Sequence, residues 1–137
     1  MHDKWARCSL RISSAQKICK SISDVLGAAP SSAVDLGTPI SKYDPSSGLR
    51  TNSTWILESG LGTTEPLEKH IERIFQFVES HSSGLRQLAT DCSMEIFCGF
   101  SSGNGQGGFV VPSDLLRGFG ESGLDLVLDL YPPERED

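Results

Sequence analysis

Leucine recurs at every second position after Gly123, and this alternation constrains the fold more than any other feature of the chain. Successive side chains of a β-strand point to opposite faces, so the pattern predicts a strand with one buried row. The two acids between the leucines, Asp125 and Asp129, would then face solvent. The sequence therefore predicts a sheet with one covered face and a core that contains the leucine row: Leu124, Leu126, Leu128 and Leu130.

The same period of two predicts further strands earlier in the chain. Three are expected, at residues 6–12, 52–59 and 94–100, and Trp55 falls on the inward side of the second. Residues 101–107 are typical of a turn, and residues 109–111 predict the return strand of a hairpin.

Apolar residues spaced three and four apart predict the helices. The first is expected from a Ser13 or Ser14 cap to Gly27, a common C-terminal stop. The second begins near Pro66, where the missing N–H costs nothing, and ends at about Ser80. A helical turn at 84–88 and a short helix capped by Ser113 complete the set.

This order of elements predicts a single α+β domain over residues 1–137. Its sheet is expected to be mixed but largely antiparallel, with helices on one face, in the manner of ferredoxin-like folds. Residues 28–50, rich in Pro, Ser and Gly, are expected to form a long loop, and residues 132–137 a flexible tail.

Composition limits the classes of function. Eighteen acids against twelve Lys and Arg give a formal charge of −6, which argues against a nucleic-acid binder. No long apolar run or signal-peptide core is present, so we expect a cytoplasmic protein without a membrane segment. Cys8, Cys19 and Cys98 lie in phase with buried residues, so we expect reduced thiols, no metal and no cofactor.

Three motifs were weighed as chemical sites. The glycine-rich residues 101–108 lack the Lys and the following helix of a phosphate-binding loop, which favours a mobile hairpin loop. His70 has no Ser or Cys beside it in the sequence and is expected to be a packing residue. Asp125 and Asp129 would lie roughly 13 Å apart on one strand, too far for paired acid–base work. We therefore predict no catalytic residues.

The second helix carries a concentration of negative charge. Four glutamates fall within an arc of roughly 60° on one flank of the helical wheel: Glu65, Glu68, Glu72 and Glu79. Lys69 is placed to pair with two of them, and an ordinary solvated helix face is the alternative interpretation. If the protein has a basic partner, we expect it to bind at this flank or at Asp125 and Asp129.

The chain also resembles a known family. The resemblance rests on residues 36–39 (LGTP), residues 53–59 (STWILES), Leu67 with His70, and the ending from Gly107 to Tyr131. In order and spacing these resemble the bacterial domain of unknown function 4279 family, over residues 6–131. The resemblance implies a small bacterial cytosolic α+β protein, some relatives of which look like immunity proteins encoded beside secreted toxins, and it supplies no catalytic residues.

Two hypotheses of function follow. The first is a binding protein without catalytic activity, an immunity protein that blocks a basic toxin such as a nuclease domain by covering its active site. The second is a small enzyme or ligand-binding module, with a cleft between the 28–50 loop and the glycine-rich 101–108 hairpin. Neighbouring genes, a toxin in one case and a metabolic operon in the other, would distinguish the two.

Overall fold

Five strands form one sheet in the computed structural model, which describes residues 4–102 and 108–131. The strands are β1 (Trp5–Ser14), β2 (Ser32–Val34), β3 (Ser53–Glu58), β4 (Ser93–Ser101) and β5 (Asp125–Leu130). The α-helices among the described residues are α1 (Cys19–Leu26), α2 (Leu67–Ser80), α3 (Ser82–Leu88) and α4 (Ser113–Glu121). Residues 103–107 of the glycine-rich loop and the expected tail at 132–137 lie outside the described residues.

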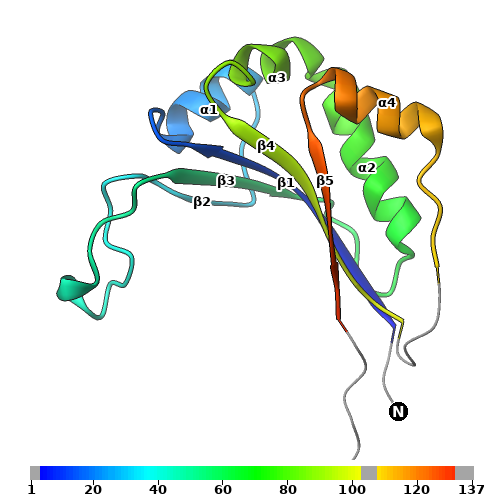
Figure 1. Cartoon of the computed structure of the whole chain (residues 1–137), viewed down its shortest axis with the longest axis horizontal. Coiled ribbons are helices and arrows are strands. Elements are labelled where there is room, and N and C mark those ends of the chain that lie inside the picture. Colours follow the sequence, from blue (N-terminus) through cyan, green and yellow to red (C-terminus); the bar gives the residue numbers. More distant parts are fainter. Residues whose placement is uncertain (1–3, 103–107, 132–137) are drawn as a thin grey trace, which may run out of the picture.

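The sheet has the order β2-β3-β1-β4-β5, with β1 at its centre (Figure 1). β1 is antiparallel to both β3 and β4, and β2 is antiparallel to β3. The first four strands therefore take the ferredoxin-like order β4-β1-β3-β2, and β5 is added parallel to β4 at the edge. The predicted α+β fold with a mixed, largely antiparallel sheet is confirmed.

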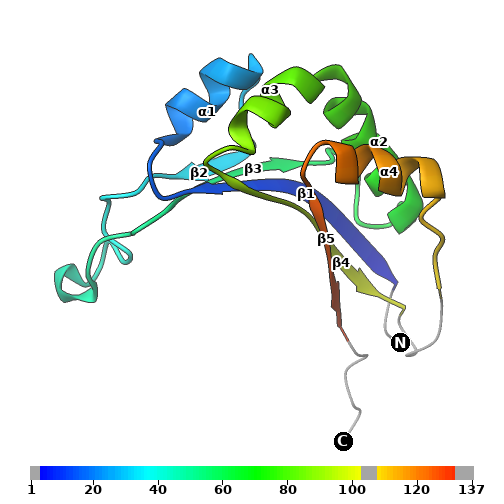
Figure 2. The ribbon, with the colours of Figure 1, turned by 45° about the horizontal axis from the view of Figure 1, so that its top comes forward.

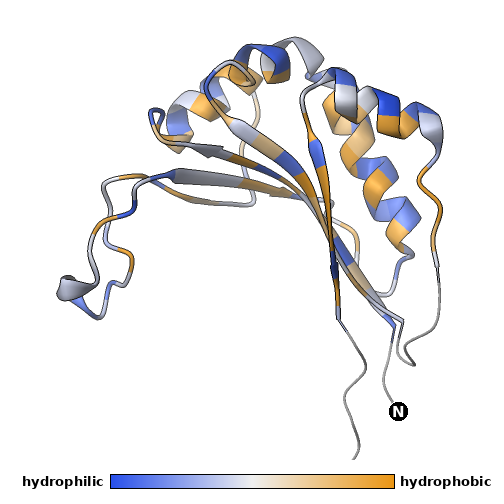
Figure 3. Ribbon diagram, viewed as in Figure 1, coloured by the Kyte–Doolittle hydropathy of each residue, from blue (hydrophilic) through white to orange (hydrophobic). Residues whose placement is uncertain are grey.

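The four α-helices of the described residues lie on one face of the sheet, and within that part of the chain the opposite face carries no helix (Figure 2). The predicted apolar stripe of α2 packs on β1. Its residues Leu67, Ile71, Ile74 and Val78 are each no more than 2% exposed. Trp55 of β3 is fully buried, as predicted, and its indole N–H donates to the Ser23 hydroxyl on α1 at 3.0 Å. Figure 3 shows the resulting alternation of hydrophobic and hydrophilic residues along the helices.

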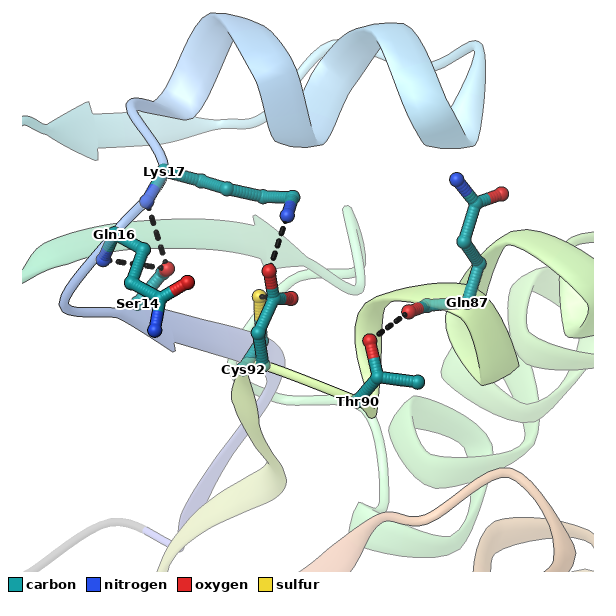
Figure 4. Close-up of polar contacts among 7 residues, drawn as sticks. Ser14, Gln16, Lys17, Gln87, Thr90 and Cys92 are labelled. Atoms are coloured by element: carbon teal, nitrogen blue, oxygen red, sulfur yellow. Dashed lines mark hydrogen bonds and ion pairs between the residues drawn. The ribbon is translucent and has the colours of Figure 1, made fainter.

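The first helix begins later than predicted, at Cys19, and neither Ser13 nor Ser14 is its cap. The Ser14 hydroxyl instead accepts from the backbone N–H groups of Gln16 and Lys17, which holds a turn before the helix (Figure 4). Asp35, from the loop after β2, accepts from the Cys19 N–H at 2.7 Å. A residue distant in sequence therefore satisfies the start of this helix. The predicted stop at Gly27 is confirmed, with φ of 68°.

Residues 109–111 do not form the predicted return strand, so the hairpin expectation is wrong. Phe109 packs its ring edge to face on Phe100, with centroids 5.7 Å apart, on the helix-covered side of the sheet. The segment that enters α4, coloured as hydrophobic in Figure 3, thus covers the core, and the edge of β4 pairs with β5. The connection from β4 to β5 is a helical crossover between parallel strands.

The leucine row that runs from Leu124 into β5 faces the predicted side of the sheet, but only its first half is covered as predicted. Leu126 lies beside Ile96 and Leu128 beside Cys98, so the row faces the helical side. Leu124 is buried and Leu126 half-buried, whereas Leu128 is 45% and Leu130 63% exposed. The expectation that Leu128 and Leu130 lie in the core is therefore wrong, because β5 is an edge strand whose second half extends beyond the helices (Figure 2).

The 28–50 loop contains regular structure of its own. After β2, the chain turns back in a short antiparallel ladder, with Gly37 N–H donating to Arg50 O and Arg50 N–H to Thr38 O, both at 2.8 Å. A 3-10 turn (Pro45–Ser47) closes the tip. The loop extends away from the sheet beyond the start of β3 (Figure 1).

Candidate functional site

The acidic flank of α2 borders a groove on the helical layer. Burial of the stripe that begins with Leu67 turns Glu68, Glu72 and Glu79 outward, and all three are exposed. They lie at spacings of four and seven residues, so they follow one side of the helix for about three turns. Three of the four predicted glutamates thus belong to one surface.

The second wall of the groove comes from residues 110–115, which lead into α4. Between this segment and α2 lies a space of about 600 Å³. Phe75 from α2 and Leu115 from α4 are half-buried on its floor, and Val110, 72% exposed, lies at its side. Apolar groups therefore line the bottom of a groove with carboxylates at its rim.

Asp114 adds a fourth carboxylate to this rim, and sequence reasoning missed it. It lies in the first turn of α4, where the partial positive charge of the helix N-terminus stabilises an anion. The groove lining within the described residues includes no Lys or Arg. Because Asp114 follows Glu72 by more than forty residues, only the packing of α4 on α2 reveals the cluster.

Glu65 does not belong to this groove. Its carboxylate pairs with Lys69 at 3.5 Å, one turn along the chain. Lys69 and Arg73 line a separate hollow with Glu65 and with Glu72 of the groove rim. Lys69 therefore pairs with Glu65, as predicted, and the rim residues Glu68, Glu79 and Asp114 do not line the hollow that holds the two cations.

The other two predicted partner-binding residues, Asp125 and Asp129, lie on the face of the sheet that has no helix. Here the charges are mixed, since the rows across β1, β4 and β5 place Arg7 with Asp129, and Arg11 with Glu95 and Asp125. Arg11 also stacks over the ring of Phe97, 3.9 Å from its centroid. This face therefore concentrates negative charge less than the groove does.

An aromatic pair lies at one end of the open face. The rings of Trp5 and Tyr131 meet with centroids 4.9 Å apart, across the backbone of Gly99. A Cβ at residue 99 would approach Trp5 Cζ3 to 3.2 Å, so glycine permits this contact. The Tyr131 hydroxyl shares a hydrogen bond with Asp129, which raises the pKa of Tyr131.

His70 has a hydrogen-bond partner that sequence reasoning did not identify. Its Nδ1 lies 2.6 Å from the Ser59 hydroxyl and its Nε2 3.1 Å from Gly62 O. We assign the proton to Nε2, which donates to the carbonyl, so Nδ1 accepts from Ser59. His70 is 1% and Ser59 7% exposed. The pair joins the start of α2 to the loop after β3, which supports the predicted packing role.

The two segments of the alternative cleft lie far apart. Residues 35–52 connect β2 to β3 at the end of the sheet where Ser14 pairs with Ser53. The described residues of the glycine-rich segment, Ser101, Ser102 and Gly108, lie at the other end, where Ser101 pairs with Trp5 and Gly108 lines a hollow with Trp5. Ten residues of β1, roughly 30 Å, separate the two ends. Their described residues therefore do not form the expected cleft.

A polar cluster joins the turns at the Ser14 end of the sheet (Figure 4). The Lys17 ammonium pairs with the Asp91 carboxylate, linking the turn before α1 to the turn before β4. This hydrogen bond lowers the pKa of Asp91. Burial raises the pKa of the neighbouring Cys92 thiol, which donates to Asp91 at 3.5 Å. The contacts are those of a structural clamp between two turns.

These features define a small α+β protein whose helical layer carries an acid-rimmed, apolar groove. The family model described as Domain of unknown function (DUF4279) matches residues 3–133, and the chain belongs to this family. The comparison with curated proteins and with solved structures gave no match. Within residues 4–102 and 108–131, the helices are too short or too polar to cross a bilayer.

Proposed function

We propose that the protein binds another protein without catalysis, as a cytoplasmic immunity protein that neutralises a basic bacterial toxin. One observation supports this above all: the groove between α2 and residues 110–115 combines an apolar floor with four carboxylates. Such a surface fits a partner segment in which Lys or Arg flank an apolar side chain. The apolar contact supplies affinity, and the charges supply orientation and rapid association.

A nuclease domain is the class of partner that this chemistry suits best. A nuclease presents Lys and Arg to the phosphates of its substrate, so its active-site surface is basic. Carboxylates that pair with those cations occupy the place of the phosphates. The mechanism we propose is steric occlusion: the toxin is bound through its substrate surface and has no access to nucleic acid.

We propose the groove, and not the open face of the sheet, as the interface. At Asp125 and Asp129 the neighbouring Arg7 and Arg11 offset the negative charge. The groove lining includes no Lys or Arg among the described residues, and of its four carboxylates Glu72 alone shares the neighbouring hollow with Lys69 and Arg73. The difference in local charge gives the groove the stronger attraction for a cationic surface.

The test compares two charge-reversed variants against the purified toxin domain encoded beside the gene of this protein. In Glu68→Lys/Glu72→Lys, both changes are at exposed positions of α2, so the fold is retained. The association rate should fall on the order of tenfold or more, and its dependence on salt should weaken. Asp125→Lys/Asp129→Lys makes the same change of charge on the open face and should associate almost as the unmodified protein does.

Loss of binding only in the Asp125→Lys/Asp129→Lys variant would move the interface to the open face. Unchanged binding in both variants would remove both surfaces from the interface. A neighbouring gene without a toxin-like domain, together with turnover of a small molecule by the purified protein, would favour the enzyme alternative. Ser59 and His70, which line a hollow of about 280 Å³, would then be the first residues to replace.

A further inference from the structure

Two cysteines that are ninety residues apart in sequence face each other in the core. Cys8 of β1 and Cys98 of β4 are direct cross-strand partners, and their Sγ atoms lie 3.7 Å apart. Cys8 is 1% exposed and Cys98 fully buried, and both are free thiols. The sequence predicted each of them to be buried but gave no indication that they meet.

The backbone geometry at this pair suits a disulfide. The Cys8 carbonyl accepts from the Ser59 N–H, and the Ala6 N–H donates to Thr63 O. The backbone hydrogen-bonding groups of Ala6 and Cys8 therefore point away from β4. Cys8 and Cys98 are therefore a non-hydrogen-bonded pair, in which Cα atoms lie about 4.5 Å apart and side chains approach most closely. Disulfides span Cα separations of about 4.4–6.8 Å, so neither strand has to move.

The two thiols also differ in their readiness to ionise. They share one S–H···S hydrogen bond, and when Cys98 is a thiolate, Cys8 donates to it, which lowers the pKa of Cys98. The same hydrogen bond is the larger cause of the raised pKa of Cys8, and burial of the thiol raises this pKa further. The shared hydrogen bond favours the thiolate at Cys98 over the thiolate at Cys8, while burial opposes ionisation of both sulfurs. Two sulfurs placed this close allow one to resolve the oxidised form of the other.

The pair lies close to the surface on one side. Cys8 is among the residues that line the hollow bordered by Arg7, Ser59 and His70, although its side chain is only 1% exposed. The other two cysteines have different partners: the Cys19 Sγ lies 3.4 Å from Val34 O, and the Cys92 thiol donates to Asp91. Only the facing pair brings two sulfurs together among the described residues.

We propose that Cys8 and Cys98 form a redox site that hydrogen peroxide converts to an intramolecular disulfide. One thiol takes an oxygen atom from the peroxide, becomes a sulfenic acid and releases water. The sulfur of the second thiol attacks the sulfenic sulfur, the S–S bond forms and a second water leaves. Two electrons pass from the two thiols to the peroxide. The product covalently joins the two central strands and is independent of the groove on α2.

The experiment uses the full-length Cys19→Ala/Cys92→Ala variant, in which only the facing pair remains. The folded protein is treated with hydrogen peroxide, denatured, alkylated and weighed by intact mass spectrometry. We expect the monomer to lose two hydrogens and take up no alkyl group, and dithiothreitol to restore two alkylation sites. The control Cys8→Ala/Cys92→Ala keeps Cys19 and Cys98, and should form no intramolecular disulfide.

A second measurement does not depend on variants. The unmodified protein, oxidised in its folded state, should yield a cross-linked peptide pair that contains Cys8 and Cys98. The proposal is overturned if both sites still take up the alkyl group after peroxide treatment, or if the oxidised product is a disulfide-linked dimer. A cross-link of Cys8 or Cys98 to Cys19 or Cys92 would overturn it equally.

Discussion

The ring of Phe75 on α2 occupies the space that a side chain at Gly118 on α4 would need. A Cβ built on residue 118 would overlap the ring. The same ring meets Phe119 edge to face, with centroids 5.5 Å apart and an interplanar angle of 83°. Because residue 118 is glycine, the two helices approach closely enough to form the floor and one wall of the groove.

The first prediction compares Gly118→Ala with Gly120→Ala in the same helix. Both variants gain the helix propensity of alanine, but a Cβ at residue 120 meets nothing within 4 Å. The free energy of unfolding of Gly118→Ala should therefore lie below that of Gly120→Ala by about 1–3 kcal/mol, the usual cost of overpacking. Urea unfolding measures the difference. Equal stabilities would show that α4 does not pack on Phe75 as described.

The second prediction compares a leucine just before β5, Leu124, with one in its second half, Leu128. Leu124→Ala should lower the free energy of unfolding by about 2–5 kcal/mol, because it leaves a cavity in the core. Leu128→Ala, on the same row, should change it by only about 0.5 kcal/mol, as is usual at the surface. Chemical denaturation of the two variants under one condition provides the comparison, and a larger loss at Leu128 would contradict the position of β5.

The third prediction concerns the buried contact between Ser59 and His70. Ser59→Ala leaves the Nδ1 of His70 without a donor, at a cost of about 1–3 kcal/mol. Ser80→Ala is the control, since that hydroxyl bonds Gln76 O at the exposed end of α2 and its loss should cost little. Thermal unfolding followed by circular dichroism measures both. If the two losses are alike, the Ser59 hydrogen bond does not hold the loop.

The fourth prediction is a pH dependence at Asp91. Lys17 lowers the pKa of this carboxyl in the folded state, so the pair stabilises the protein above the unfolded pKa of about 3.9 and loses its effect as the pH falls through the folded value. Asp91→Asn should therefore melt below the unmodified protein at neutral pH, and the gap should close as the pH falls below the unfolded pKa of about 3.9.

The control for this prediction is Asp24→Asn. Asp24 pairs with Lys20 at 3.1 Å, but both side chains are well exposed, and such pairs contribute little. Its melting temperature should follow that of the unmodified protein over the whole range. A gap for Asp91→Asn that persists unchanged in acid would contradict the assigned role of the ion pair.

Local sequence patterns predicted the helices and strands better than they predicted what these elements pack against. The stripe of α2 and the phase of β5 were correct because helical and strand periods depend on neighbours in the sequence. The burial of Leu128 was wrong because it depends on how far the helices extend over the edge strand. The start of α1 was wrong because Asp35, a residue from beyond β2, supplies the acceptor for its first N–H.

Only the α2 side of the candidate groove could be predicted from the sequence. The outward turn of Glu68, Glu72 and Glu79 follows from the helical wheel, and these residues do form one rim. Asp114 and Val110 join them only because residues 109–111 pack over Phe100 and carry the chain back toward α2. The meeting of Ser59 with His70 has the same origin, since the loop after β3 folds onto the helix.

The central place of β1 has a consequence for synthesis of the chain on the ribosome. Leu10 is paired on one side with Leu57 and on the other with Ile96, so the first strand to emerge must wait for both of its neighbours. Until β4 has left the ribosome, the apolar row of β1 has no complete sheet to join, and non-local pairing of this kind is slow. We therefore expect the apolar row of β1 to stay open to chaperone binding until β4 has been made.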